Sequence, residues 1–306
     1  MNGRGAGQLK FLDREACPIC QAQSVKLGNK QGSYINRKFS IRECTDCSYL
    51  FVENPCVSFD WIYDKAYYHG KGADPLVNYV FELRNPTRSL RTHELGGIIE
   101  AVSSITGSIS GKSWLDYGCG NGTLVRHLTA RFPEAKQIVG FEQGWIADEA
   151  RCSGINILTG AQLAPLNGSF DVVTAIEVLE HVLDPLETLT SIRRLLKPGG
   201  LLFYTTANSA PFRRNLFEWG YLRPEVHIGY FNPRSISAAL QRSGFFVHPA
   251  GWLPGFEKII RFKILKTLGF KKERNSFRLM PWSMLSRIVD RRYRLSDMPM
   301  ASASAG

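Results

Sequence analysis

The sequence predicts an α/β fold built around a largely parallel sheet, and two observations support this prediction. From residue 111 onward, short apolar runs alternate with segments of helical periodicity, which is the pattern of consecutive β/α units. In addition, a glycine-rich loop follows the first apolar run and precedes the first helical segment. This is the position of nucleotide-type sites at the carboxyl end of a strand. We therefore expect a ligand at that edge of the sheet.

The elements can be placed in chain order. Strands are expected at 113–117, 137–141, 155–159, 170–175, 201–206 and 245–248. Helices are expected at 123–132, 145–152, 184–196 and 233–243, and Asn232-Pro233 provides a cap and first turn for the last of them. Residues 298–303 can form a weak strand, which Pro299 would confine to a sheet edge. Residues 254–296 show no clean amphipathic stripe, and the alternating IIRFKI is typical of a strand.

The chain divides into four parts. Residues 1–56 contain paired cysteines between polar, turn-rich segments, and residues 57–110 form an aromatic-rich connector whose latter half, 76–104, reads as helix. Residues 111–250 are the α/β core. Residues 251–306 form a basic extension. We expect the first two parts to be small additions to one main domain.

Composition and charge limit the location and the partners. No run of about 18 apolar residues is present and the N-terminus MNGRGAGQLKF has no apolar core, so we expect a cytoplasmic protein. The net charge is +11, and the segment from Glu257 to Asp297 holds twelve Lys/Arg against four Asp/Glu, a net charge of +8. Such a patch suits nucleic acid, an acidic substrate or a solvated surface. It also suits anionic lipid headgroups, with peripheral contact at the inner face of the membrane.

Four of the seven cysteines form two C-x-x-C pairs, Cys17/Cys20 and Cys44/Cys47. Each pair places two thiolates on one face of a tight turn, and two such turns complete a tetrahedral four-thiolate site for zinc. All four ligand positions would be filled, so the zinc would be structural. The alternative is four unrelated thiols.

The loop LDYGCGNG combines glycines with an acid. Gly118, Gly120 and Gly122 allow a ligand to approach the backbone, although a tight turn alone would also use them. Asp116 would repel a diphosphate and attract a cation. S-adenosylmethionine (SAM) carries both an ammonium and a sulfonium, so the loop favours SAM. Glu142 follows the next strand, where it can accept the ribose hydroxyl protons or simply cap a helix.

Several stretches in order resemble the class I SAM-dependent methyltransferases over about residues 60–250: LDYGCGNG, VGFEQG, FDVVTAIEVLEHVLDP and LLKPGGLLFYTTAN. The resemblance implies a Rossmann-like, seven-stranded, mostly parallel sheet, here preceded by a small zinc-knuckle module. SAM would lie across the carboxyl ends of the first strands. The expected acid after the third strand is absent from LTGAQLAPL. The implied cofactor-binding residues are Asp116, Gly118, Cys119, Gly120, Gly122, Glu142, Gln143, Ala161, Gln162 and Glu177.

Two histidines are candidates for a catalytic base. His181 follows the fourth strand, beside the reacting methyl, and His227 lies in RPEVHIGYFNP before the helix at 233. Related zinc-knuckle sugar C-methyltransferases carry E-H-x-x-Y/F-F near the acceptor, whereas here Val226 separates Glu225 from His227. Shaping of the pocket is the alternative role for each histidine.

A second resemblance concerns EVLEH. In ubiquinone-type O-methyltransferases a matching E-x-x-E-H set is associated with a divalent ion, and Glu177, Glu180 and His181 preserve those residue types.

The leading prediction for function is methyl transfer to a small-molecule acceptor. Similar zinc-knuckle sequences belong to sugar, surface-polysaccharide and natural-product pathways, so a hydroxyl or carbon of a nucleotide- or lipid-linked sugar is the expected target. An rRNA base methyltransferase, with the zinc module and basic extension on RNA, is the alternative. It usually shows an Asp/Asn-Pro-Pro-aromatic turn, where this chain has Ile176-Glu177-Val178-Leu179. A non-enzymatic SAM-binding scaffold is the third interpretation.

Overall fold

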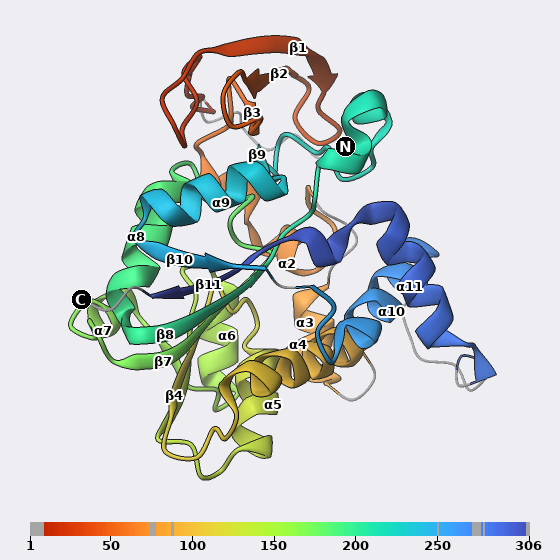
Figure 1. Cartoon of the computed structure of the whole chain (residues 1–306). Coiled ribbons are helices and arrows are strands. Elements are labelled where there is room, and N and C mark those ends of the chain that lie inside the picture. The colour runs from red at the N-terminus through yellow and green to blue at the C-terminus, as the bar shows by residue number, and fades with distance from the viewer. Residues whose placement is uncertain are drawn as a thin grey trace.

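The structure, a computed structural model, describes residues 9–73, 78–86, 89–249, 251–270, 277 and 279–303. A large central sheet has helices on both faces, and a smaller sheet lies above it (Figure 1). No helix among these residues is long and apolar enough to cross a membrane.

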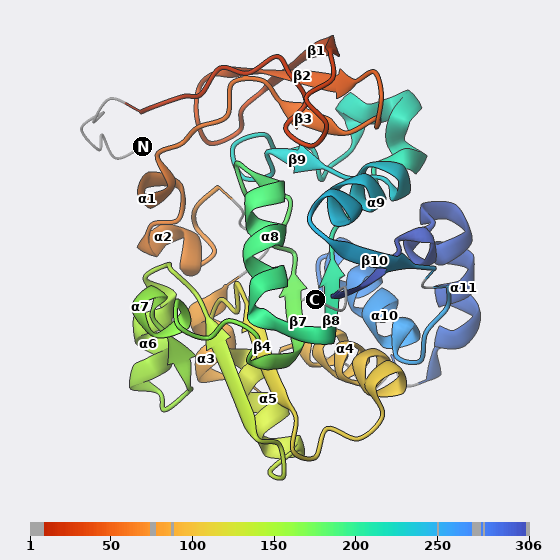
Figure 2. The same cartoon turned by 60° about the vertical axis from the view of Figure 1, so that its left-hand side comes forward.

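The central sheet has seven strands in the order β10-β11-β8-β7-β4-β5-β6. Only β11 runs antiparallel to its neighbours, so the sheet is mostly parallel, as predicted. The strands are β4 (Ser113–Tyr117), β5 (Gln137–Phe141), β6 (Ile157–Leu158), β7 (Phe170–Ile176), β8 (Leu196–Thr205), β10 (Phe245–His248) and β11 (Met300–Ala303). The carboxyl ends of β7 and β8 point toward the smaller sheet (Figure 2).

Alternate strand residues face the two helical layers. In β4, Trp114 packs with α4 (Arg91–Thr106), α5 (Thr123–Arg131), α6 (Ile146–Cys152) and α10 (Phe256–Thr267). The next residue, Leu115, packs on the opposite face with α7 (Gly160–Leu163), α8 (Pro185–Leu195) and α9 (Pro233–Arg242). Because both faces are covered, apolar residues predominate in the central strands β4, β5 and β7.

Caps explain where several helices begin. Asp184 accepts the backbone N–H of Glu187 at the start of α8, and Asn232 forms a capping box with Ser235 at the start of α9. The remaining helices are α1 (Phe59–Ile62), α2 (Lys65–Tyr68), α3 (Tyr79–Arg84), α11 (Trp282–Tyr293) and the 3₁₀ helices η1 (Ala210–Glu218) and η3 (Leu295–Asp297).

The smaller sheet joins the N-terminal segment to the core. Its strands β1 (Ser24–Gln31), β2 (Lys38–Cys44) and β3 (Leu50–Val52) are antiparallel, and the fourth strand, β9 (Gly229–Tyr230), comes from the core. The side chain of Asn232 also donates to the carbonyl of Ser48 over 2.6 Å. The cysteine-bearing segment is therefore completed by the loop that contains His227.

Three local expectations were wrong. The helix expected at 76–104 is two helices, α3 and α4, with Asn85-Pro86 between them because proline disfavours a helical conformation at the residue before it; residues 76–77 and 87–88 lie outside the described residues. The C-terminal strand β11 lies inside the sheet, between β10 and β8. Pro299 is compatible with this position because it precedes the strand, and its carbonyl accepts from the Tyr204 hydroxyl over 2.8 Å.

The third wrong expectation is a strand at IIRFKI, which is part of helix α10. Ile259 packs toward α4 and the sheet, whereas Phe262 and Leu265 pack with Trp282 of α11. A helix buried on two sides carries apolar residues around much of its circumference. This is why no single stripe was visible in the sequence.

Candidate active site

A cavity of about 910 Å³ lies at the carboxyl ends of β4, β5 and β7. The connector helices α1 to α3 contribute part of its wall. The predicted residues that line it are Asp116, Gly118, Cys119, Gly120, Glu142, Gln143, Glu177 and His181. The structure thus brings together most of the candidates from three separate strand ends.

The glycine loop forms the floor beside β4. Gly118 and Gly120 have φ values of +73° and +54°, in the left-handed region that favours glycine. A Cβ atom at Gly118 would lie 2.6 Å from Val178 Cγ2, and one at Gly120 would lie 2.8 Å from Tyr79 Cε1. The absence of side chains therefore keeps the floor open between two walls.

Gly122 has a different place. It is buried, caps α5 with φ +69°, and a Cβ atom there would lie 2.8 Å from Ile155 Cγ2. It is outside the cavity wall, so its glycine serves the turn into α5 and the packing of that helix.

Asp116 is an acid held in a setting that suits a cation. It is 4% exposed, and the Thr174 hydroxyl donates to its Oδ1 over 2.8 Å. Burial raises the pKa of Asp116 to about 7, against the lowering effect of the Thr174 hydrogen bond. A ligand with a positive charge would stabilise the ionised carboxylate, so this donor set fits the ammonium and sulfonium of SAM.

Glu142, at the end of β5, ties two loops together. Its Oε2 accepts from the backbone N–H of Gly120 over 3.1 Å, and its Oε1 accepts from that of Gly144 over 2.7 Å. Burial raises the pKa of Glu142, while these hydrogen bonds oppose the rise. The carboxylate is thus fixed beside the glycine loop, with further lone pairs for ligand hydroxyls.

Ala161 and Gln162 lie apart from this group. Both are exposed on α7 and outside the cavity wall. Gln162 Oε1 accepts the backbone N–H of Thr159 over 2.9 Å, and Thr159 accepts the N–H of Gln162 in return. This capping box explains the residue type at Gln162 without a ligand.

Glu177 begins the turn after β7 and has an uncommon backbone conformation, with φ +54°. Its Oε1 accepts from the Thr205 hydroxyl over 3.0 Å and lies 3.2 Å from Lys263 Nζ. Burial alone would raise the pKa of Glu177, but Lys263 and Lys266 outweigh it and lower that pKa to about 2. Glu177 is therefore ionised.

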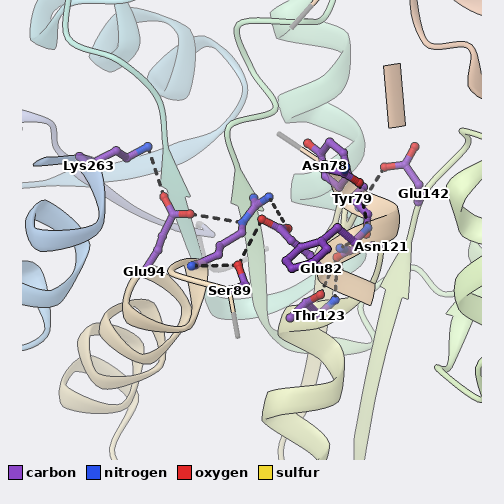
Figure 3. A network of polar contacts seen from close by, with 12 residues as sticks. Asn78, Tyr79, Glu82, Ser89, Glu94, Asn121, Thr123, Glu142 and Lys263 are labelled. Carbon is purple, nitrogen blue, oxygen red and sulfur yellow. Dashed lines mark hydrogen bonds and ion pairs between the residues drawn. The ribbon is translucent and has the colours of Figure 1, made fainter. Parts of the chain in front are cut away.

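Lys263 continues into a partly buried chain of charges (Figure 3). Its Nζ lies 3.2 Å from Glu94 Oε1, and Arg91 Nε lies 3.3 Å from Glu94 Oε2. Arg91 also lies 3.7 Å from Glu82 of α3. Helix α10, from the C-terminal extension, is thereby connected to the acid at the cavity wall.

Tyr221, which no sequence pattern singled out, connects the two acids of EVLE. Its hydroxyl oxygen lies 2.5 Å from Glu180 Oε1 and 3.1 Å from Glu177 Oε2. Burial and the charge of Glu177 raise the pKa of Glu180 to about 8. At neutral pH this turn therefore holds one protonated acid and one ionised acid.

The two histidines form adjacent layers. His181 lines the cavity, with Nδ1 2.9 Å from the Val226 carbonyl and 3.0 Å from the Tyr63 hydroxyl. His227 is buried behind it, with ring centroids 4.9 Å apart, and stacks on Tyr221 at 4.0 Å. Its Nδ1 lies 2.9 Å from the Tyr221 carbonyl. Because carbonyls only accept, each Nδ1 carries hydrogen, and in the neutral rings Nε2 is the basic nitrogen.

Glu225 explains the departure from the E-H pattern. It points away from His227, and its Oε1 accepts from the backbone N–H groups of Tyr34 and Ile35 over 2.7 and 3.2 Å. The extra residue, Val226, thus lets the loop hold the N-terminal segment with one side chain and present His227 toward His181 with another.

The four cysteines of the C-x-x-C pairs come together. Their sulfur atoms lie within 4.8 Å of one another, for example 3.7 Å between Cys17 and Cys47 and 3.3 Å between Cys20 and Cys44. A tetrahedral zinc with bonds of about 2.3 Å requires separations of roughly 3.8 Å. Backbone N–H groups also point at the sulfurs, as from Ile19 to Cys17. The donor set fits zinc.

Among the described residues, this is the only group of three or more His, Cys, Asp or Glu side chains that converges in this way. The E-x-x-E-H residues do not form a second one. Glu177 pairs with Lys263 and Glu180 with the Tyr221 hydroxyl. The described geometry therefore gives no support for a divalent ion at EVLEH.

Known proteins identify the family of this chain. A family model described as a methyltransferase domain matches residues 88–250, just over half of the chain. Ubiquinone biosynthesis O-methyltransferases from Pseudomonas paraeruginosa and Methylococcus capsulatus are each 37% identical, over 113 and 108 residues. These matches cover 34% and 33% of this chain and 47% and 46% of those proteins, so the chain spans about half their length.

Two solved methyltransferase structures are similar to the chain at low sequence identity. The plantazolicin methyltransferase in complex with SAH is 14% identical, with a TM-score of 0.46 over 79% of this chain and 91% of that one. A SAM dependent methyltransferase from Aquifex aeolicus is 19% identical, with a TM-score of 0.43 over 57% and 92%.

Proposed function

Because the chain belongs to the class I SAM-dependent methyltransferases, we propose that it methylates an oxygen or carbon of a hydroxyl-rich small molecule, such as a sugar, glycan or natural-product intermediate. The observation that carries this proposal is His181. It lines the cavity with its Nδ1 beside the Val226 carbonyl. Its Nε2 is then the group that can accept a proton from the acceptor.

The rest of the wall supports a polyhydroxylated acceptor. Aromatic rings from α1 and α2 line the cavity, as do exposed acids near its mouth. Apolar ring faces pack against sugar rings, and carboxylates accept hydrogen bonds from hydroxyls. These residues are Phe59, Tyr63, Tyr67, Tyr68, Asp60, Asp184 and Glu187.

The same acids argue against RNA. A nucleic-acid channel places Lys and Arg along the phosphate path. Here Asp60, Asp184 and Glu187 accompany Lys65 among the exposed lining residues. A sugar linked to a nucleotide or lipid carries fewer phosphates than RNA, so its binding needs fewer Lys and Arg side chains. We therefore favour such a sugar as the acceptor.

We also propose that Cys17, Cys20, Cys44 and Cys47 bind one structural zinc ion. The closed set of four thiolates leaves no position for a substrate. The segment that they anchor includes the partners of Glu225 and of β9. Zinc would therefore hold the loop that carries His227.

The chain's residues divide the work of the reaction. Bound SAM supplies an electrophilic methyl group on a sulfonium. Asp116 and Glu142 bind and orient the cofactor through charge and hydrogen bonds. His181 removes the acceptor's proton. His227 stacks on Tyr221 and packs against the His181 ring from behind, which keeps that ring in position. Protonated Glu180 and ionised Glu177 fix the turn after β7, which lies between the cofactor-binding and acceptor-binding residues.

The experiment is transfer of label from methyl-labelled SAM to nucleotide sugars, glycan lipids, phenolic O-methyl acceptors and total RNA. Label in a sugar-containing product, lost in His181→Asn but kept in His248→Asn on the exposed end of β10, supports the proposal. Label transfer that ribonuclease removes would contradict it and favour the RNA alternative.

A further inference from the structure

Helix α11 and the residues just before it expose apolar side chains to solvent. Of the nine large hydrophobic residues found exposed among the described residues, five lie between Leu268 and Ile288. Leu279 is 89% exposed, Met284 57% and Ile288 53%. The other four are Leu12, Val25, Ile105 and Phe246, which are scattered over different elements. Scattered residues need no explanation, whereas a cluster indicates an interaction site.

The cluster has a helical geometry. Met284 and Ile288 are one turn apart, so they project from the same side of α11. Trp282 and Ser286 are buried on the opposite side, where Ser286 donates to the Glu257 carbonyl of α10 over 3.3 Å. Leu279 and Met280 directly precede the helix. We call Leu279, Met280, Met284 and Ile288 the α11 face.

Aromatic contacts hold this face in place. The rings of Phe270 and Phe277 lie 4.9 Å apart, which keeps the turn before α11 beside the end of α10. At the other side, the guanidinium of Arg287 stacks on Trp252 at 3.9 Å. Met284 and Ile288 are thus presented on a packed helix, and Leu279 and Met280 lie just before it.

Arginines border the α11 face. Arg291 follows Ile288 by three residues and lies on the same side of the helix, while Arg287 and Arg292 flank that side. All three are exposed. An apolar stripe with arginines on its borders is the arrangement of helices that lie in a membrane interface.

We propose that the α11 face docks on an anionic lipid surface, with its apolar side chains at the acyl boundary and its arginines at the phosphates. The combination of apolar and positively charged side chains distinguishes among three possible binding partners. An RNA surface would pair with the arginines but would leave the apolar stripe in water. A second copy of the chain would bring like-charged arginines together. Anionic lipid satisfies both features, and this inference does not depend on the identity of the methyl acceptor.

The test is co-sedimentation of the full chain with vesicles of phosphatidylcholine alone or mixed equally with phosphatidylglycerol. We expect binding to the anionic vesicles and a loss of about tenfold or more in affinity for Met284→Glu/Ile288→Glu. Val25→Glu, an exposed apolar position on β1, is the matched control and should bind like wild type. Each arginine removed in Arg291→Gln and Arg292→Gln should cost about fivefold, less at high salt.

Other results would overturn the proposal. These are absence of wild-type binding to anionic vesicles, equal binding by the double variant and Val25→Glu, or a dimer that the double variant dissociates while vesicle binding persists. Light scattering of each variant distinguishes the last result, and circular dichroism confirms that the variants are folded.

Discussion

The two walls of the cavity are built in different ways. The wall that we assign to the cofactor comes from the end of β4, the glycine loop after it and the end of β5, where Glu142 accepts from the backbone N–H of Gly120. The wall that we assign to the acceptor includes Tyr63 of the connector and His181 after β7, and the loop that carries His227 packs behind His181. The first is local in sequence, and the second depends on contacts between distant segments.

This difference predicts how each wall fails. A substitution in a wall that is local in sequence should remove only the binding contribution of the substituted residue. A wall assembled from distant segments should fail as a unit when any supporting segment unfolds. The predictions below test this contrast.

The largest expected effect is that of Cys44→Ser. Structural zinc sites contribute folding energy to the segments they organise, so the N-terminal sheet should lose its order together with the loop at β9. We expect acceptor kcat/KM to fall by about 10³-fold or more, with SAM affinity within about fivefold of wild type. Metal analysis and calorimetry measure this, with exposed Cys152→Ser as control. Full acceptor turnover in metal-free Cys44→Ser would contradict the account.

His181→Asn should lower kcat by about 10²- to 10³-fold, the usual contribution of a general base. Its Kd for SAM should not change, because His181 belongs to the acceptor wall. Single-turnover kinetics with calorimetry separate the two quantities. A variant with unchanged kcat would remove His181 from the chemistry.

Asp116→Asn should weaken SAM binding by about ten- to a hundredfold, the value of a hydrogen bond to a charged group. Asp148→Asn, an exposed acid on α6, is the matched control. Calorimetry measures both. Equal affinities for the two variants would mean that the buried carboxylate does not meet the cofactor.

Lys263→Met tests the connection to α10. With its principal cation removed, the pKa of Glu177 should rise from about 2, so that the variant loses activity at mildly acid pH where wild type does not. A depressed carboxyl pKa stabilises the fold above the unfolded value and loses that contribution as pH falls toward 2. The variant should therefore also melt lower at neutral pH. Lys258→Met on the same helix, an exposed pair with Glu100, should have little effect on either.

The same contrast explains what could be predicted from the sequence. β4 and β5, with Asp116 near the end of β4 and Glu142 directly after β5, were predicted because apolar runs and turn residues are local signals. Tyr221 and Lys263 were not, since nothing within WGYLRP or IIRFKI indicates that these side chains meet Glu177. β11 was placed at a sheet edge because of Pro299, but Pro299 precedes the strand and β11 lies between β10 and β8. Ala161 and Gln162 were transferred by position, and their exposure on α7 shows the limit of that procedure.

The central claim is that a buried acid with a raised pKa meets a cationic cofactor. Calorimetry of SAM binding at pH 6.5, in buffers of different ionisation enthalpy, tests it directly. With a pKa of about 7, Asp116 in the free protein carries roughly three quarters of a proton at that pH, and binding of a cation should release it. We predict this release in wild type and its loss in Asp116→Asn. Binding without proton release, or equal release by the variant, would contradict the account.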